Sequence, residues 1–231
     1  MSAELYLCAN HNPRNRAGQT LLRRLADRLP RPFRACHVGA FHGDHREWAR
    51  TTVEFLTGLG ATCAAPRLSD PLIDVDRARA EIESADLLYL DGGDTVAGVE
   101  LVRARGLLDA FAVAAQRARF VVGLSGGACA AGPYTIGYRD DGSAYVAPCL
   151  DMGAPLPLDV HDEGDDWPEM RALLELAPPE PRGLVIPTHG VLHVTNRGRE
   201  LASLGEPLVE RRSIARDGSW TIERIARATA Q

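Results

Sequence analysis

Short apolar runs alternate along this chain with longer segments whose apolar residues recur at helical spacing. The strand-like runs, rich in aliphatic and β-branched residues, cover residues 5–9, 33–40, 61–65, 86–90 and 120–122. The helix-like segments cover residues 20–29, 44–56, 74–84, 95–102 and 107–116. Strands that alternate with helices in this way are joined by right-handed crossovers. The pattern therefore predicts an α/β fold of three layers, with a mostly parallel sheet and helices on both faces.

The start of two of these helices is marked by polar residues. Asp44 and Glu47 have the spacing of a capping box, in which side chains at both positions satisfy free backbone amides. Either Asp94 or Thr95 is suited to cap the helix that runs to residue 102.

The pattern changes after residue 132. A hairpin is predicted from segments 134–139 and 144–150, which flank the turn sequence Asp-Asp-Gly-Ser. An acidic loop, residues 159–166, precedes a helix over 168–176, and short strands at 184–187, 191–194 and 207–210 finish the chain. No composition break or repeat suggests a second core, so we expect residues 1–231 to form a single α/β domain that ends in β-hairpins.

Charge and composition narrow the range of partners. The formal net charge is -5, and the 26 basic and 31 acidic residues are interspersed, with no basic stripe. Nucleic acid and membrane surfaces are therefore poor candidates, and a short peptide is a better one. No leader or membrane-length apolar run is visible, and the five scattered cysteines suit reduced thiols. We expect a cytoplasmic protein, and its oligomeric state, including a homo-oligomer, is left open.

Two glycine-rich turns carry the candidate chemistry. Residues 123–127, Gly-Leu-Ser-Gly-Gly, follow a predicted strand and match the elbow that exposes a nucleophilic serine, Ser125, at a helix N-terminus. Residues 91–95, Asp-Gly-Gly-Asp-Thr, follow another predicted strand. Parallel strands bind ligands beyond their carboxyl ends, so both turns are expected at one edge of the sheet. The alternative is a pair of tight turns without chemistry.

A serine nucleophile needs a base, which is most often histidine. His161 is the favoured candidate because it lies in the acidic loop, where carboxylates would stabilise its charged form. The alternative is a surface loop whose acids complement the following helix. The other histidines, expected in structural roles, are His11, His37, His42, His45, His189 and His193.

Two segments have some of the residues of a metal site. His42 and His45 with Asp44 lack a further ligand at a suitable spacing, so loop and capping roles are favoured. A calcium loop starting at Asp159 would place Met170 where a glutamate is required. We therefore expect no metal.

These residues resemble the peptidase E (aspartyl dipeptidase) and cyanophycinase family of serine peptidases. That family has a strand followed by Gly-Gly-Asn-x, then Gly-x-Ser-Ala-Gly-Ala, then a Pro-His or Asp-x-His loop. This chain has Gly-Gly-Asp-Thr at 92–95, Gly-Leu-Ser-Gly-Gly-Ala at 123–128 and Asp-Val-His at 159–161, in the same order. The resemblance covers most of the chain and implies a flavodoxin-like sheet similar to class I glutamine amidotransferase domains.

The resemblance also implies roles for individual residues. Ser125 would be the nucleophile, His161 the general base and acid, and Asp140 the group that orients the imidazole, although Asp141 and Asp162 are alternatives. Peptide substrates, with Asp-x dipeptides among them, would be cleaved through an acyl-enzyme without metal or cofactor. The oxyanion hole would be formed by Gly93 and Gly126, and the substrate-binding turn by Gly92, Asp94 and Thr95.

The sequence departs from the family pattern at three places. Asp94 replaces the usual asparagine, Gly126 replaces the usual alanine, and Thr-His-Gly at 188–190 stands where peptidase E has a glutamate. Two other functions therefore stay open. One is a cyanophycinase-like or β-aspartyl peptide hydrolase, and the other is a non-catalytic ligand-binding domain.

Overall fold

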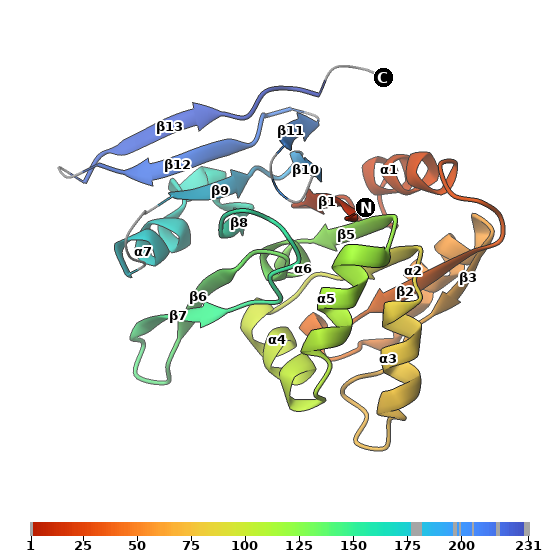
Figure 1. Cartoon of the computed structure of the whole chain (residues 1–231). Coiled ribbons are helices and arrows are strands. Elements are labelled where there is room, and N and C mark those ends of the chain that lie inside the picture. The colour runs from red at the N-terminus through yellow and green to blue at the C-terminus, as the bar shows by residue number, and fades with distance from the viewer. Residues whose placement is uncertain are drawn as a thin grey trace.

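A seven-stranded sheet lies at the centre of the molecule, with strand order β11-β10-β1-β5-β4-β2-β3 (Figure 1). The structure is a computed structural model that describes residues 2–176, 182–195, 198, 200–204, 206–215 and 218–228; for Asp162 and Glu163 it describes the backbone alone. The five parallel strands are β1 (Glu4–Cys8), β2 (Phe33–Val38), β3 (Ala61–Ala64), β4 (Leu87–Leu90) and β5 (Phe120–Leu124). The antiparallel hairpin of β10 (Val191–Thr195) and β11 (Glu200–Leu204) extends the sheet beside β1.

Helices cover both faces of this sheet, as the alternation of strands and helices predicts (Figure 1). All four residues of β4 are buried because successive side chains point to opposite, equally covered faces. Leu88 and Leu90 face one core, and Leu87 and Tyr89 face the other. The first face packs against α3 (Val75–Glu83), α4 (Thr95–Ala104) and α5 (Leu108–Arg117), and the second against α1 (Arg16–Ala26) and α2 (Arg46–Gly58). Among the described residues, no helix is long and apolar enough to span a membrane.

A second sheet, with strand order β13-β12-β9-β8, lies beside the β10–β11 hairpin (Figure 1). Trp167, which directly precedes α7 (Pro168–Leu176), and Met170 of α7 pack against Val185 of this sheet. Its strands are β8 (Leu158–Val160), β9 (Arg182–Ile186), β12 (Glu210–Ile214) and β13 (Trp220–Arg224). The remaining elements are η1 (Ala40–His42), α6 (Gly126–Ala130), the hairpin β6 (Tyr134–Tyr138) and β7 (Ala144–Pro148), η2 (Asp162–Asp165) and α7 (Pro168–Leu176).

Several of the predicted boundaries are wrong, and three show why. The first helix begins at Arg16 rather than residue 20, because the Asn15 side chain accepts a hydrogen bond from the Gly18 amide and caps it. The acidic loop begins with a strand, β8. The strand predicted at 207–210 instead starts at Glu210 and continues to Ile214.

The capping box predicted at Asp44 is also wrong. Asp44 has a φ of 56°, and α2 begins at Arg46 with His45 as its N-cap, without a side-chain hydrogen bond. The buried Asp44 carboxylate instead accepts a hydrogen bond of 2.6 Å from the amide of Ser69, which lies in the loop between β3 and α3. A long-range contact has therefore displaced the local capping role.

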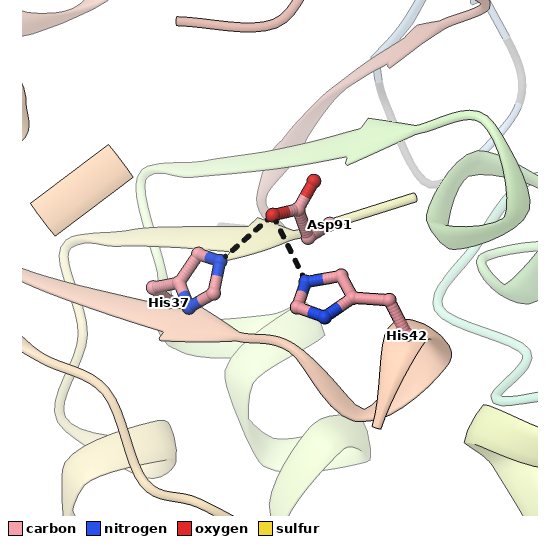
Figure 2. Close-up of side chains that lie close together, drawn as sticks. All are labelled: His37, His42 and Asp91. Atoms are coloured by element: carbon pink, nitrogen blue, oxygen red, sulfur yellow. Dashed lines mark hydrogen bonds and ion pairs between the residues drawn. The ribbon is translucent and has the colours of Figure 1, made fainter. Parts of the chain in front are cut away.

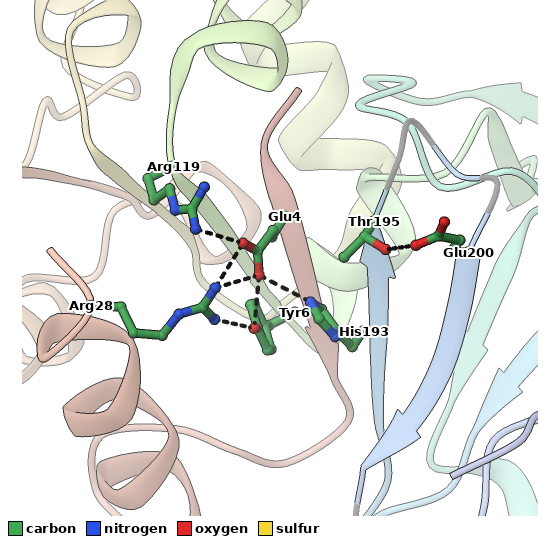
Figure 3. A network of polar contacts seen from close by, with 7 residues as sticks. All are labelled: Glu4, Tyr6, Arg28, Arg119, His193, Thr195 and Glu200. Atoms are coloured by element: carbon green, nitrogen blue, oxygen red, sulfur yellow. Dashed lines mark hydrogen bonds and ion pairs between the residues drawn. The ribbon is translucent and has the colours of Figure 1, made fainter. Parts of the chain in front are cut away.

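The amino end of β1 is held by a polar network around Glu4 (Figure 3). Arg28 donates to the Glu4 carboxylate at 2.7 Å, and Arg119 and His193 lie within 3.1 and 3.2 Å of it. Burial raises the pKa of the Glu4 carboxyl, but hydrogen bonds from Arg28, His193 and Tyr6 outweigh burial, so the pKa lies below its usual value. This network ties the segment after α1, the residue before β5, and β10 to β1 at the end of the sheet opposite the glycine-rich turns.

Candidate active site

Ser125 lies at the sharp junction between β5 and α6. Its φ of 50° and ψ of −121° are unfavourable for a residue with a side chain. The Ser125 amide donates to the carbonyl of Cys8 at 2.8 Å, and its own carbonyl accepts from the amide of Ala128 at 2.8 Å. Hydrogen bonds to β1 and to α6 thus hold the serine in the elbow conformation that the sequence predicts.

The two glycine-rich turns pack directly against each other. A Cβ atom on Gly126 would lie 2.0 Å from the carbonyl oxygen of Gly93, and one on Gly127 would lie 2.5 Å from the carbonyl oxygens of Leu90 and Asp91. Only glycine permits such an approach. The expectation that both turns meet at one edge of the sheet is confirmed.

His161 lies beside Ser125 although it comes from the other sheet. It directly follows β8, has a φ of 76°, and its amide donates to the carbonyl of Ile186 at 3.3 Å. Its Nε2 atom is 3.2 Å from the Ser125 hydroxyl oxygen, within hydrogen-bonding distance. The structure thus brings together the two residues singled out as nucleophile and base.

Asp140 is not brought to this pair. It is exposed at the tip of the β6–β7 hairpin, whose turn Figure 1 shows at the outer end, far from the junction of β5 and α6. β6 starts shortly after α6 and extends outward, and its five extended residues, Tyr134–Tyr138, span about 16 Å. Asp141 serves the turn itself, accepting from the amide and hydroxyl of Ser143 at 2.9 and 2.6 Å. Assigning Asp140 to orient His161 therefore needs correction, and turn formation explains both acids.

The acidic loop around His161 is largely structural. The buried Asp159 carboxylate accepts from the amide of Met170 at 3.0 Å, near the start of α7, where it complements the helix dipole. Asp166 accepts from Arg212 at 2.7 Å and from the Trp220 indole at 3.1 Å. Acids at both ends of this loop thus fix α7 and β12 in place.

The turn after β4 has its own internal hydrogen bonds. The Asp94 side chain accepts from the Ala97 amide at 2.9 Å, so Asp94, not Thr95, caps α4. The Thr95 hydroxyl donates instead to the carbonyl of Gly126 at 3.1 Å, linking the two turns. Gly126 is the first residue of α6, so its amide has no partner within the helix. Among the described residues, the Gly93 amide donates no hydrogen bond.

A buried cluster next to this turn was missed by reasoning from the sequence. His37 at the end of β2, His42 in η1 and Asp91 after β4 point toward one another (Figure 2). The Asp91 Oδ2 atom lies 3.0 Å from His37 Nε2 and 3.2 Å from His42 Nε2. One signal was available: two polar residues at the carboxyl ends of adjacent parallel strands, His37 and Asp91, point to a shared site.

Burial and hydrogen bonding act in opposite directions on the pKa of Asp91. The side chains of His37, His42 and Asp91 are only 1%, 6% and 2% exposed. Burial raises the pKa of the Asp91 carboxyl, but hydrogen bonds from both imidazoles and from the Gly92 amide outweigh it and hold the pKa well below its usual range.

The same three side chains have the composition of a metal site. Their donor atoms lie within 4.8 Å of one another. However, the Nδ1 atom of His42 accepts a hydrogen bond of 2.9 Å from the backbone amide of His45. The ring proton must therefore be on Nε2, facing Asp91, whereas a metal bound at Nε2 would require the proton on Nδ1, against an N–H group. The geometry fits a hydrogen-bonded carboxylate better than a metal centre.

Comparisons with known proteins agree with this architecture. A peptidase from an acI-B1 actinobacterium has the same fold, with a TM-score of 0.74 and 14% identity over 100% of this chain and 98% of that chain. A proposed peptidase E protein from Listeria monocytogenes EGD-e has a TM-score of 0.62 and 12% identity over 89% of this chain and 99% of that chain. No curated protein sequence matches.

A parallel α/β sheet with a serine on a strand-to-helix elbow is an architecture of hydrolases. The family model of peptidase family S51 matches residues 34–158, more than half of the chain and including both glycine-rich turns. This chain belongs to peptidase family S51 and is a serine peptidase. The matched range ends before His161.

Proposed function

We propose that Ser125 is the nucleophile and His161 the general base of a peptidase that cleaves short peptides. The distance of 3.2 Å between the Ser125 hydroxyl and His161 Nε2 is the observation that carries this proposal. His161 would take the hydroxyl proton as Ser125 attacks the scissile carbonyl, and then deliver it to the leaving amine. Water activated by the same imidazole would hydrolyse the acyl-enzyme.

The oxyanion formed in this attack would be stabilised by the amides of Gly93 and Gly126. The close packing of their two turns supports this role, as does the position of Gly126 at the start of α6. Gly92 would border the same space, because a Cβ atom on it would lie 3.1 Å from the Ser125 Cβ atom. Asp140 has no part in the proposal, given its place at the hairpin tip.

For the substrate, we propose peptides with an acidic N-terminal residue, such as Asp-x dipeptides. The loop after β1 supports this choice because it carries Arg14, whose guanidinium pairs with no carboxylate among the described residues. The Arg14 guanidinium lies 4.6 Å from the centre of the Trp48 ring, which restricts its motion.

For the location of the protein, we propose the cytoplasm, which the five unpaired cysteines support.

The test is peptide hydrolysis by wild-type protein and by Ser125→Ala and His161→Ala variants. Ser125→Ala is expected to lower turnover by about 10³-fold or more, whereas Ser143→Ala, which removes an exposed turn serine, is the control and should keep full activity. His161→Ala should fold but lose labelling of Ser125 by a fluorophosphonate. Unchanged turnover in Ser125→Ala, or full-rate labelling of His161→Ala, would reject the proposal.

A panel of Asp-x, β-Asp-x and neutral dipeptides separates the proposed substrate from its alternatives. Preference for Asp-x supports the acidic N-terminal residue, and preference for β-Asp-x identifies a β-aspartyl peptide hydrolase. Tight retention of a ligand without turnover or labelling would identify a non-catalytic binding domain.

A further inference from the structure

The buried side chains of His37, His42 and Asp91 are here called the His–Asp cluster. Asp91 directly precedes the turn Gly92–Gly93 in the sequence, and both histidines contact its carboxylate. The three side chains come from three separate elements: the end of β2, the η1 turn and the residue that follows β4. A chain folded only for stability has little reason to bury three ionisable groups together, because burying each of them is unfavourable. Their arrangement therefore suggests a role tied to the turn itself.

The Asp91 carboxylate accepts three hydrogen bonds, and each comes from a different segment. Oδ2 is 3.0 Å from His37 Nε2 and 3.2 Å from His42 Nε2, and Oδ1 accepts from the Gly92 amide at 2.8 Å. The last of these bonds fixes the first peptide group of the glycine turn. The two imidazoles in turn fix the carboxylate, so any rotation of Asp91 would release the Gly92 amide.

The orientation of the His42 ring is fixed by a hydrogen bond to its other nitrogen, Nδ1. Its Nδ1 atom accepts from the His45 amide at 2.9 Å, which leaves Nε2 as the donor to Asp91. Gly39 leaves room for this arrangement, since a Cβ atom there would lie 2.9 Å from the His42 ring and 3.2 Å from the His37 ring. The sequence is thus adapted locally to hold both rings against one carboxylate.

The η1 turn also holds the other end of the glycine turn. The carbonyl of Phe41, adjacent to His42, accepts from the Asp94 amide at 2.7 Å. A Cβ atom on Gly93, whose φ is 136°, would lie 2.1 Å from the same Phe41 oxygen. Gly92 and Gly93 are therefore clamped between two hydrogen bonds, one through the cluster and one to η1, and the Gly93 carbonyl lies against Gly126 beside the serine elbow.

We propose that the His–Asp cluster positions the Gly92–Gly93 turn so that its backbone can stabilise the oxyanion formed when Ser125 attacks a peptide carbonyl. This inference rests on the proposed function. His37, His42 and Asp91 are positioning residues, since they act through the turn and do not touch the reacting atoms. A displacement of about 1 Å in such a group lowers turnover by about 10²-fold.

The kinetic test compares His42→Leu with His42→Gln, whose side-chain amide nitrogen can replace Nε2 as the donor to Asp91. His42→Leu is expected to lower kcat for peptide hydrolysis by about 10- to 100-fold and to change KM by less than about 3-fold. His42→Gln should recover most of the lost kcat. The matched control is His193→Leu, which removes another histidine–carboxylate pair, with Glu4, at the opposite end of the sheet.

His193→Leu should keep kcat within about 3-fold of wild type even if its stability falls as much as that of His42→Leu. Equal losses of kcat in His42→Leu and His193→Leu would mean that the effect is general destabilisation and would overturn the proposal. A kcat of His42→Gln no higher than that of His42→Leu would also overturn the proposal.

A spectroscopic test separates this proposal from the proposed function. Imidazole 15N spectra of Ser125→Ala protein should show His42 with its proton on Nε2, and the Gly92 amide shift should change in His42→Leu but not in His42→Gln. A proton on His42 Nδ1, or a zinc ion that shifts both ring signals and survives dialysis, would overturn the proposal. If wild-type protein neither hydrolyses peptides nor reacts with a fluorophosphonate, the proposed function fails. Separately, an unchanged Gly92 amide shift in His42→Leu would refute the positioning role.

Discussion

Ser125 occupies a backbone conformation, φ 50° and ψ −121°, that glycine adopts readily and other residues do not. The folded protein must therefore store strain at its proposed nucleophile. This strain can be measured by comparing Ser125→Gly with Ser125→Ala. Both variants lose the hydroxyl and its contact with His161, so the difference between them reports the backbone alone.

The expected difference follows from two opposing free energies. A non-glycine residue in such a region is destabilised by about 1–3 kcal/mol. Glycine loses more conformational entropy on folding, which offsets about 0.5–1 kcal/mol of the relief. The midpoints of these two ranges leave Ser125→Gly more stable than Ser125→Ala by about 1 kcal/mol, or by about 2–4 °C in Tm for a chain of this length.

Urea denaturation followed by circular dichroism measures the free energy of unfolding, and calorimetry measures Tm. Gly142→Ala is a useful control, because Gly142 also has a positive φ, 79°, but lies in the exposed hairpin turn away from the site. It should lose stability, showing that the assay detects backbone strain at a single position. If Ser125→Gly is no more stable than Ser125→Ala while this control responds, the elbow is unstrained and the reasoning is wrong.

Three further predictions concern the surroundings of the site. Asp140→Asn should keep kcat within about 3-fold of wild type, because Asp140 lies at an exposed turn. A loss of kcat of about 10²-fold would mean that Asp140 does act on His161. Gly126→Ala should lower turnover by about 10²-fold and the free energy of unfolding by about 1–3 kcal/mol, since its Cβ atom would lie 2.0 Å from the Gly93 oxygen. Steady-state kinetics measure the first effect and urea denaturation the second. Full activity of this variant would contradict the close packing of the two turns. The lowered pKa of Asp91 means that its contribution to stability is present above the unfolded pKa of about 3.9 and is lost as pH falls through the folded pKa. Urea denaturation between pH 5 and pH 3 should therefore show a shallower decline in Asp91→Asn than in wild type, by up to about 1.4 kcal/mol per pH unit below pH 4, and parallel declines would refute the assignment.

Similar local motifs proved to have different partners in the folded chain. Asp44 and Asp94 both precede helices and both suit an N-cap, yet Asp94 caps α4 whereas Asp44 binds the amide of Ser69 in a distant loop. Local sequence describes what a side chain near a helix start can do. Which amide it reaches depends on segments that fold beside it.

The parallel sheet and the serine elbow could be predicted from the amino-acid sequence because both depend on short-range patterns. β4 and β5 are continuous apolar runs followed by glycines, and neither needs a distant partner to be recognised. The pairing of Ser125 with His161 was predicted from the acidic surroundings of His161 together with a family resemblance, since a separation of 36 residues and a change of sheet leave no signal in the local spacing.

The His–Asp cluster and the position of Asp140 were decided by the tertiary structure. His37, His42 and Asp91 lie up to 54 residues apart and meet only because β2 and β4 are neighbours in the sheet. Asp140 is close to Ser125 in sequence but is carried away from it by β6. Strand order and hairpin direction, which arise from packing across the whole chain, determine which polar groups share a site.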